Sequence, residues 1–127
     1  MKVKSVTDIN QSRELSEFLA LESADFGWDI FSDGSTRLLP IDDWDGHNGI
    51  EFVPAWSLSA LLNEVPDEID DENGETYVLK MLKEGGHYDL WYEEQYDEAD
   101  PIEVSSQEEM VDVCVELLIE LHKEKFI

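Results

Sequence analysis

Two long stretches of this chain contain many acidic residues but neither lysine nor arginine. Residues 38–78 hold eleven acidic residues, and residues 84–122 hold thirteen. In the whole chain, 32 Asp and Glu stand against 8 Lys and Arg, so the formal net charge is −24. We interpret most of these side chains as a solvated surface that is laid over a folded domain.

The apolar content indicates that the chain folds. Hydrophobic residues make up 42% of the 127 residues, and aromatic residues make up 10%. Disordered acidic chains lack such residues. A chain of this length buries roughly two-thirds of the surface that its unfolded form exposes, which is enough for one core. We therefore predict a single acidic α+β domain over residues 1–127.

The charge also restricts the partners. A nucleic-acid binder needs cations that displace the counterions of phosphates, and this chain has too few for a basic patch. Anionic membranes repel it for the same reason. Residues 1–8 lack the apolar stretch of a signal peptide, and the single cysteine, Cys114, excludes an internal disulfide. We expect a cytoplasmic protein whose charged partners are basic proteins or metal cations, with no direct binding of nucleic acid or membrane.

Local patterns place most of the secondary structure. Thr7 or Asp8 is suited to cap a helix that runs to about residue 21. Residues 26–39 indicate a possible hairpin, residues 50–53 a short strand that ends at Pro54, and Ser57 the N-cap of a brief helix. Asn73 and Gly74 form the strongest hairpin turn signal in the chain.

Residues 75–94 predict a β-meander that turns at Gly85 and Gly86. Residues 95–104 read as an acidic loop. Ser105 or Ser106 has the spacing of a capping box for a final helix that runs to about Lys123. The predicted fold class is α+β, with an antiparallel sheet around residues 75–94 that is packed by an N-terminal helix and a long C-terminal helix.

The final helix carries a stripe of acids that we call the acid stripe: Glu109, Asp112, Glu116 and Glu120. Like charges one helical turn apart are unfavourable, and no cation within the stripe offsets them. The stripe is either a solvated face or a row of carboxylates about 6 Å apart that imitates a phosphate backbone. Apolar residues cover most of the remaining helix surface, so either other elements wrap the helix or a second copy pairs with it.

Further candidate residues lie outside the acid stripe. As contacts for a protein partner we add the carboxylates of Glu93, Glu94 and Asp97 and the indole of Trp44. Aromatic residues beside loops often anchor interfaces. For Trp28, Trp56 and Trp91 we expect core packing instead.

Catalytic and metal-binding motifs are weak. The loop at residues 42–49 is rich in potential ligands, and Asp43, Asp45 and His47 form a candidate site for a divalent ion, although their spacing matches no known motif. Cys114 lies on the apolar side of the final helix, where a thiol behaves as an inert hydrophobe. His87 and His122 are expected to be structural. We predict no cofactor and no enzymatic activity.

Three segments carry a resemblance to a known group of proteins. They are residues 53–66 (VPAWSLSALLNEVP), the Asn73–Gly74 turn with residues 77–80 (YVLK), and residues 116–122 (ELLIELH). Together they resemble small uncharacterised proteins encoded by phages and mobile elements of gut Bacteroidetes, over about residues 50–127. The resemblance implies an accessory protein in a bacterial host, and it carries over no catalytic residue.

Three functions are consistent with these observations. The first is an acidic protein-interaction module that acts as a decoy for a basic, nucleic-acid-binding host protein. The second is a small metal-dependent enzyme that uses the loop at residues 42–49. The third is a structural phage component that forms homo-oligomers through the C-terminal helix.

Overall fold

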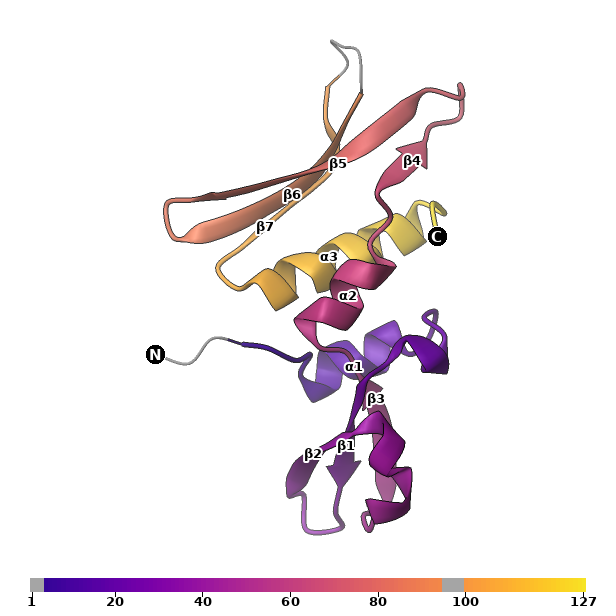
Figure 1. Ribbon diagram of the computed structural model, residues 1–127, viewed down its shortest axis with the longest axis vertical. Helices are drawn as coiled ribbons and strands as arrows, with labels where there is room; N and C mark the ends of the chain where they lie inside the picture. Colours follow the sequence, from indigo (N-terminus) through magenta and orange to yellow (C-terminus); the bar gives the residue numbers. More distant parts are fainter. Residues whose placement is uncertain (1–3, 95–99) are drawn as a thin grey trace.

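The computed structural model describes residues 4–94 and 100–127, except the side chains of residues 43–45. Two antiparallel sheets and the helices α1 (Ile9–Leu15), α2 (Leu58–Glu64) and α3 (Met110–Lys123) form an α+β fold, which confirms the predicted class. In Figure 1, α3 lies between the larger sheet and the two shorter helices, and the smaller sheet extends beyond α1. Within the described residues, no helix is both long and apolar enough to cross a membrane.

The smaller sheet has the strand order β2-β1-β3. Strands β1 (Phe26–Ile30) and β2 (Thr36–Pro40) form the hairpin that the sequence predicts, and the 3-10 helix η2 (Ile41–Gly46) follows β2. Strand β3 (Glu51–Ala55) runs through Pro54, whereas the sequence predicted that the strand ends there. Since β3 is an edge strand, one row of its amides has no partner strand and a proline is tolerated.

The larger sheet has the order β4-β5-β6-β7. The predicted meander is present as β5 (Thr76–Glu84) and β6 (His87–Glu94), joined by Gly85 and Gly86 at φ 62° and 82°. The Asn73–Gly74 turn connects β5 to β4 (Glu68–Asp70), a strand that sequence reasoning missed. Gly74 has φ 80°, a backbone conformation that favours glycine.

Two predictions near the C-terminus are wrong. Part of the expected loop at residues 95–104 and the expected cap at Ser105 belong to strand β7 (Ile102–Gln107). Ser105 lies opposite Leu90 of β6, and its buried hydroxyl donates to the backbone oxygen of Val113 at 3.4 Å. The N-cap of α3 is Glu109, which makes no side-chain capping bond. Pairing with β6 therefore outweighs the local capping signal.

The first helix is shorter than predicted. Asp8 caps it through a capping box with Gln11, as expected, but the helix ends at Leu15. The hydroxyl of Ser16 donates to the backbone oxygen of Arg13 at 2.8 Å, and such local bonds compete with helix propagation. The chain then passes through the 3-10 helix η1 (Leu21–Ser23).

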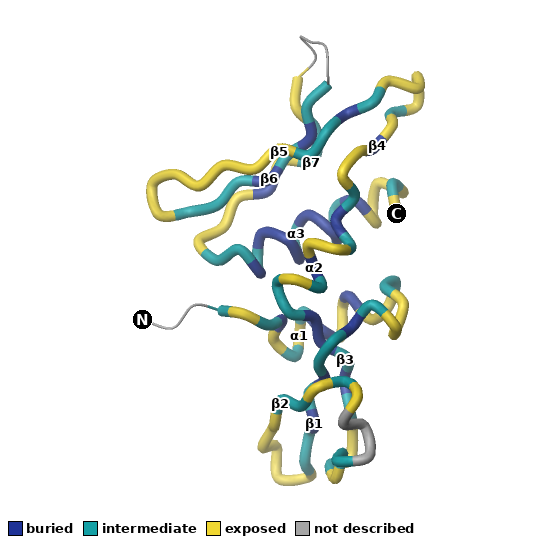
Figure 2. Tube along the Cα trace, viewed as in Figure 1, coloured by how far each residue is buried: buried dark blue, intermediate teal, exposed yellow. Residues whose placement is uncertain are grey.

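One hydrophobic cluster connects the three helices with the larger sheet. Its members include Leu15, Trp56, Leu61, Tyr92 and Leu118. Helix α3 contacts β6 and β7 on one side and α1 and α2 on the other, so its apolar surface is covered within the chain (Figure 2). The broad apolar arc of α3 is thereby explained by wrapping and gives no support to pairing of two copies. Trp56 is fully buried, as predicted.

Candidate functional site

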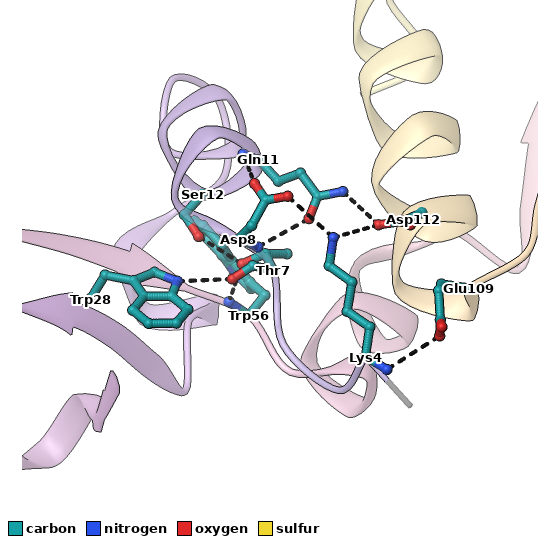
Figure 3. A network of polar contacts seen from close by, with 9 residues as sticks. All are labelled: Lys4, Thr7, Asp8, Gln11, Ser12, Trp28, Trp56, Glu109 and Asp112. Carbon is teal, nitrogen blue, oxygen red and sulfur yellow. Dashed lines mark hydrogen bonds and ion pairs between the residues drawn. The ribbon is translucent and has the colours of Figure 1, made fainter. Parts of the chain in front are cut away.

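The acid stripe lies on the side of α3 that faces α1 and the N-terminal segment. All four side chains of the acid stripe are partly buried. Lys4 donates from its backbone amide to Glu109 at 3.2 Å and from its ammonium to Asp112 at 2.7 Å. Figure 3 shows Lys4 reaching across to α3 at these two residues. The cation that the stripe lacks in sequence is thus supplied by the opposite end of the chain.

Neutral and basic groups contact the rest of the stripe. The side-chain amide of Gln11, on α1, donates to Asp112 at 2.8 Å, and that of Gln107, at the end of β7, donates to Glu116. The ammonium of Lys123 lies 3.4 Å from Glu120. Asp112 is thus paired with Lys4 and Glu120 with Lys123, and Glu116 accepts from a neutral amide.

A buried polar network fixes the segment that carries Lys4. The hydroxyl of Thr7 accepts from the amide of Trp56 at 3.1 Å and lies 2.7 Å from the hydroxyl of Ser12. The indole N–H of Trp28 donates to the backbone oxygen of Thr7 at 2.9 Å (Figure 3). Because Thr7 and Ser12 are fully buried, these bonds anchor the chain just before α1. Trp28 is half-buried rather than a core residue.

A shallow groove of about 440 Å³ lies between α1 and α3. We call it the acidic groove. Val115 and Ile119 provide its apolar part, and Lys4 is the cation among its lining residues. The remaining lining residues are polar or acidic: Asp8, Gln11, Glu14, Gln107, Asp112, Glu116 and Glu120. The groove thus combines an apolar surface with carboxylates from two helices.

No protein-family model, curated protein or solved structure matches this chain. The residues of the groove must therefore be interpreted from their own chemistry.

Glu93 and Glu94, two further predicted contact residues, do not line the acidic groove. Glu93 and Glu94 are consecutive on β6, so their side chains point to opposite faces of the sheet. Glu93 accepts from the indole N–H of Trp91 at 3.2 Å. Asp97 and the side chain of Trp44 lie outside the described residues. The acid stripe therefore lies together on α3, whereas Glu93 and Glu94 lie on β6, away from the groove.

The histidine of the predicted metal loop binds a buried carboxylate. His47 Nδ1 lies 2.5 Å from Oδ1 of Asp29, which is fully buried on β1. Asp29 also accepts from the amides of Asn48 and Gly49, at 3.0 and 2.8 Å, and from the guanidinium of Arg37 at 3.2 Å. Burial alone raises the pKa of Asp29, but these donors outweigh it and lower the pKa to about 2.

This arrangement has a structural role, because the Asp29 carboxylate links β1 to β2 and to the loop after η2. The side chains of Asp43 and Asp45 lie outside the described residues. Elsewhere in the described chain, no group of three or more His, Cys, Asp or Glu is arranged to hold a metal ion. Sequence reasoning missed Asp29; the available signal was an acid within the alternating apolar pattern of residues 26–30.

The remaining titratable candidates have structural surroundings. His122 stacks on Phe18, with the ring centroids 4.2 Å apart. His87 Nε2 lies 3.7 Å from a carboxylate oxygen of Asp89. Cys114 is fully buried, and burial raises the pKa of its thiol to about 12. A thiol in this state is protonated at neutral pH and is a poor nucleophile.

Proposed function

We propose that this chain is an acidic protein-interaction module that binds a basic segment of another protein in the acidic groove. The observation that carries the proposal is the composition of the groove. The carboxylates of Asp8, Glu14, Glu116 and Glu120 line the same groove as the apolar side chains of Val115 and Ile119.

Lysine and arginine side chains fit this composition. Each has an aliphatic stem that packs on apolar surface and a charged head that binds carboxylates. Lys4 gives an internal example, since its ammonium contacts Asp8 at 3.2 Å and Asp112 at 2.7 Å. Lys4 does not contact three carboxylates of the groove, those of Glu14, Glu116 and Glu120. We propose that these three bind the cations of the partner.

The partner class that we favour is a basic protein whose binding surface normally receives nucleic acid, with this chain acting as a decoy. The net charge of −24 and the two stretches without lysine or arginine support long-range attraction to such a surface. The resemblance to proteins of phages and mobile elements suggests a host protein as the target. In this proposal the acid stripe contributes mainly through Glu116 and Glu120.

Titration with an arginine-rich peptide tests the groove. Glu116→Gln with Glu120→Gln removes two charges inside the groove, and Glu22→Gln with Glu72→Gln removes two at exposed positions outside it. We expect the groove variant to weaken binding about tenfold or more, because hydrogen bonds to charged groups are lost. The control variant is expected to change the affinity much less.

Salt dependence provides the second measurement. Affinity is expected to fall steeply between about 50 and 500 mM NaCl, since the attraction is electrostatic. An affinity that does not change with salt would rule out the decoy mechanism. Equal weakening by the groove and control variants would show that net charge, and not the groove, binds the peptide.

A further inference from the structure

The β4–β7 sheet has one face that no described element covers. Tyr77, Leu90 and Tyr92 are buried on the face toward α3. Because side chains alternate along a strand, the residues between them point to the opposite side, which we call the outer face. Figure 1 shows α3 on one side of the sheet and no described helix or strand on the other.

The outer face carries an apolar patch around Trp91. On β5, Val78 and Leu82 lie on this face, opposite Glu93 and Asp89 of β6. On β7, a bulge places Val104 beside Trp91, between the pairs Leu90–Ser105 and Tyr92–Ile102. Leu82 is 43% exposed and Val104 is 62% exposed. Trp91 is half-buried and was expected in the core; its indole N–H is already bonded to Glu93.

Acidic side chains surround this patch. Glu93 and Asp89 share the outer face on β6, Glu68 extends it on β4, and Glu84 lies at the end of β5. Lys80, opposite Trp91, is the cation among the described outer-face residues of β4, β5 and β6. A sheet face that presents an aromatic residue, exposed apolar side chains and acids, here with Lys80 between the apolar residues, offers groups that protein interfaces use.

We infer that the outer face of the β4–β7 sheet is a docking surface for a basic segment that carries aliphatic side chains between its cations. The aliphatic groups pack on Trp91, Leu82 and Val104, and the cations pair with the acidic rim. A second copy of this chain is a poor occupant, because face-to-face packing would bring the same acidic rims together in two chains that each carry −24.

This surface is distinct from the acidic groove, whose lining comes from the N-terminal segment, α1, α3 and the end of β7. The inference shares with the proposed function only the premise that the partner is basic. It adds that the partner needs apolar side chains, which the groove alone does not require.

Two peptides of equal length and charge test the inference. In one, lysine alternates with valine; in the other, lysine alternates with serine. The variant Leu82→Thr with Val104→Thr removes exposed apolar groups while keeping residues that suit strands. Ile50→Thr, at a position that is 75% exposed outside the sheet, is the control. Trp91→Thr is a second, stronger variant.

The wild-type protein is expected to bind the lysine–valine peptide about tenfold more tightly than the lysine–serine peptide. The double threonine variant and Trp91→Thr should lose this preference, and Ile50→Thr should keep it. Persistence of the preference in the double variant, or its equal loss in the control, overturns the inference. So does a concentration-dependent dimer in light scattering that the double variant abolishes.

The groove variant separates this inference from the proposed function. If Glu116→Gln with Glu120→Gln weakens the binding of both peptides equally and the preference for the lysine–valine peptide remains, the groove proposal and the docking surface both stand. If that variant has no effect but the preference depends on Leu82 and Val104, the groove proposal fails and the docking surface stands. If the groove variant weakens binding and no preference for valine exists, only the docking surface fails.

Discussion

The ammonium of Lys4 lies 2.7 Å from a carboxylate oxygen of Asp112, a residue 108 positions further along the chain. Burial lowers the pKa of Lys4, but hydrogen bonds to Asp112 and Asp8 outweigh it, so the pKa is raised above its ordinary value. Lys4 is therefore a permanent internal counter-ion at neutral pH. Lys4 pairs with Asp8 and Asp112 in the acidic groove, and it does not contact the carboxylates of Glu14, Glu116 and Glu120.

Replacing Lys4 tests this role. Lys4→Met keeps an apolar stem and removes the cation that competes with an external ligand, so affinity for an arginine-rich peptide should rise several-fold. The free energy of unfolding should fall by about 1 kcal/mol or less, because the ion pair is partly exposed. Calorimetric titration and urea unfolding measure the two effects. Lys83→Met, the same change on the exposed part of β5, serves as the control, and an equal gain in that variant would contradict a local role for Lys4.

Asp29 should make stability depend on pH at the acidic end. Its pKa is lowered to about 2, so its ionised form stabilises the fold above the ordinary pKa of about 4. This contribution is lost as the pH falls from about 4 towards 2. Asp29→Asn should lower the thermal midpoint by several degrees at pH 7, because an amide cannot accept from all the donors that surround it.

The difference in thermal midpoint between wild type and Asp29→Asn should shrink below about pH 4, because Asp29 of the unfolded chain takes up a proton there while the folded carboxylate is still ionised. Circular dichroism melts over a pH series measure this difference. Glu72→Gln, at an exposed position, is the matched control. Parallel curves for wild type and Asp29→Asn down to about pH 2.5 would contradict a stabilising ionised Asp29.

Glu103 should have the opposite effect on stability. Burial raises its pKa, and the charges of Glu124 and Glu120 raise it further. A carboxyl with a raised folded-state pKa contributes stability below its ordinary pKa, and that contribution is lost as the pH rises through the raised value. Ionised Glu103 therefore destabilises the fold at pH 7.

Glu103→Gln should raise the thermal midpoint at pH 7, and the gain should vanish below about pH 4. Glutamate and glutamine have the same shape and would occupy the same backbone conformation at position 103, with φ 51°. The comparison therefore isolates the effect of the charge. Glu108→Gln makes the same change in net charge at an exposed position. A gain of equal size in Glu108→Gln would attribute the effect to net charge rather than to the neighbours of Glu103.

Cys114 should be unreactive in the folded protein. Its thiol is fully buried on α3, and its raised pKa of about 12 leaves almost no thiolate at pH 8. Ellman's reagent should label it only after denaturation in urea. Cys114→Ser should lower the free energy of unfolding by about 1–3 kcal/mol, because a hydroxyl is costly to bury without a good partner. Rapid labelling under native conditions would contradict this burial.

Local signals in the sequence were sufficient for several elements. Ser57 caps α2 and accepts from the amide of Ala60, as its position before an apolar helical segment predicts. Gly74 forms the expected turn because it tolerates positive φ. The end of α3 at Lys123 follows from its helical periodicity. In each case the cause lies within a few residues of the position itself.

Relationships between distant residues required the tertiary structure. Strand β7 exists because β6 pairs with it, and this pairing buries Ser105, which local rules assign to a cap. The outward position of Trp91 depends on which face of β6 meets α3. The ionised Asp29 is stabilised in its buried position by donors from β2 and from the loop after η2, which lie far from it in sequence.

The stripe of acids on α3 and the net charge of −24 were determined by the sequence itself, because helical periodicity and composition need no knowledge of partners. Whether that stripe faces water was decided only by the fold. The docking of α1 and the N-terminal segment beside α3 brings Lys4 and Gln11 to Asp112 and leaves Glu116 and Glu120 in an open groove. Charge is a local property of residues, but its neutralisation depends on which distant groups the fold places within hydrogen-bond distance.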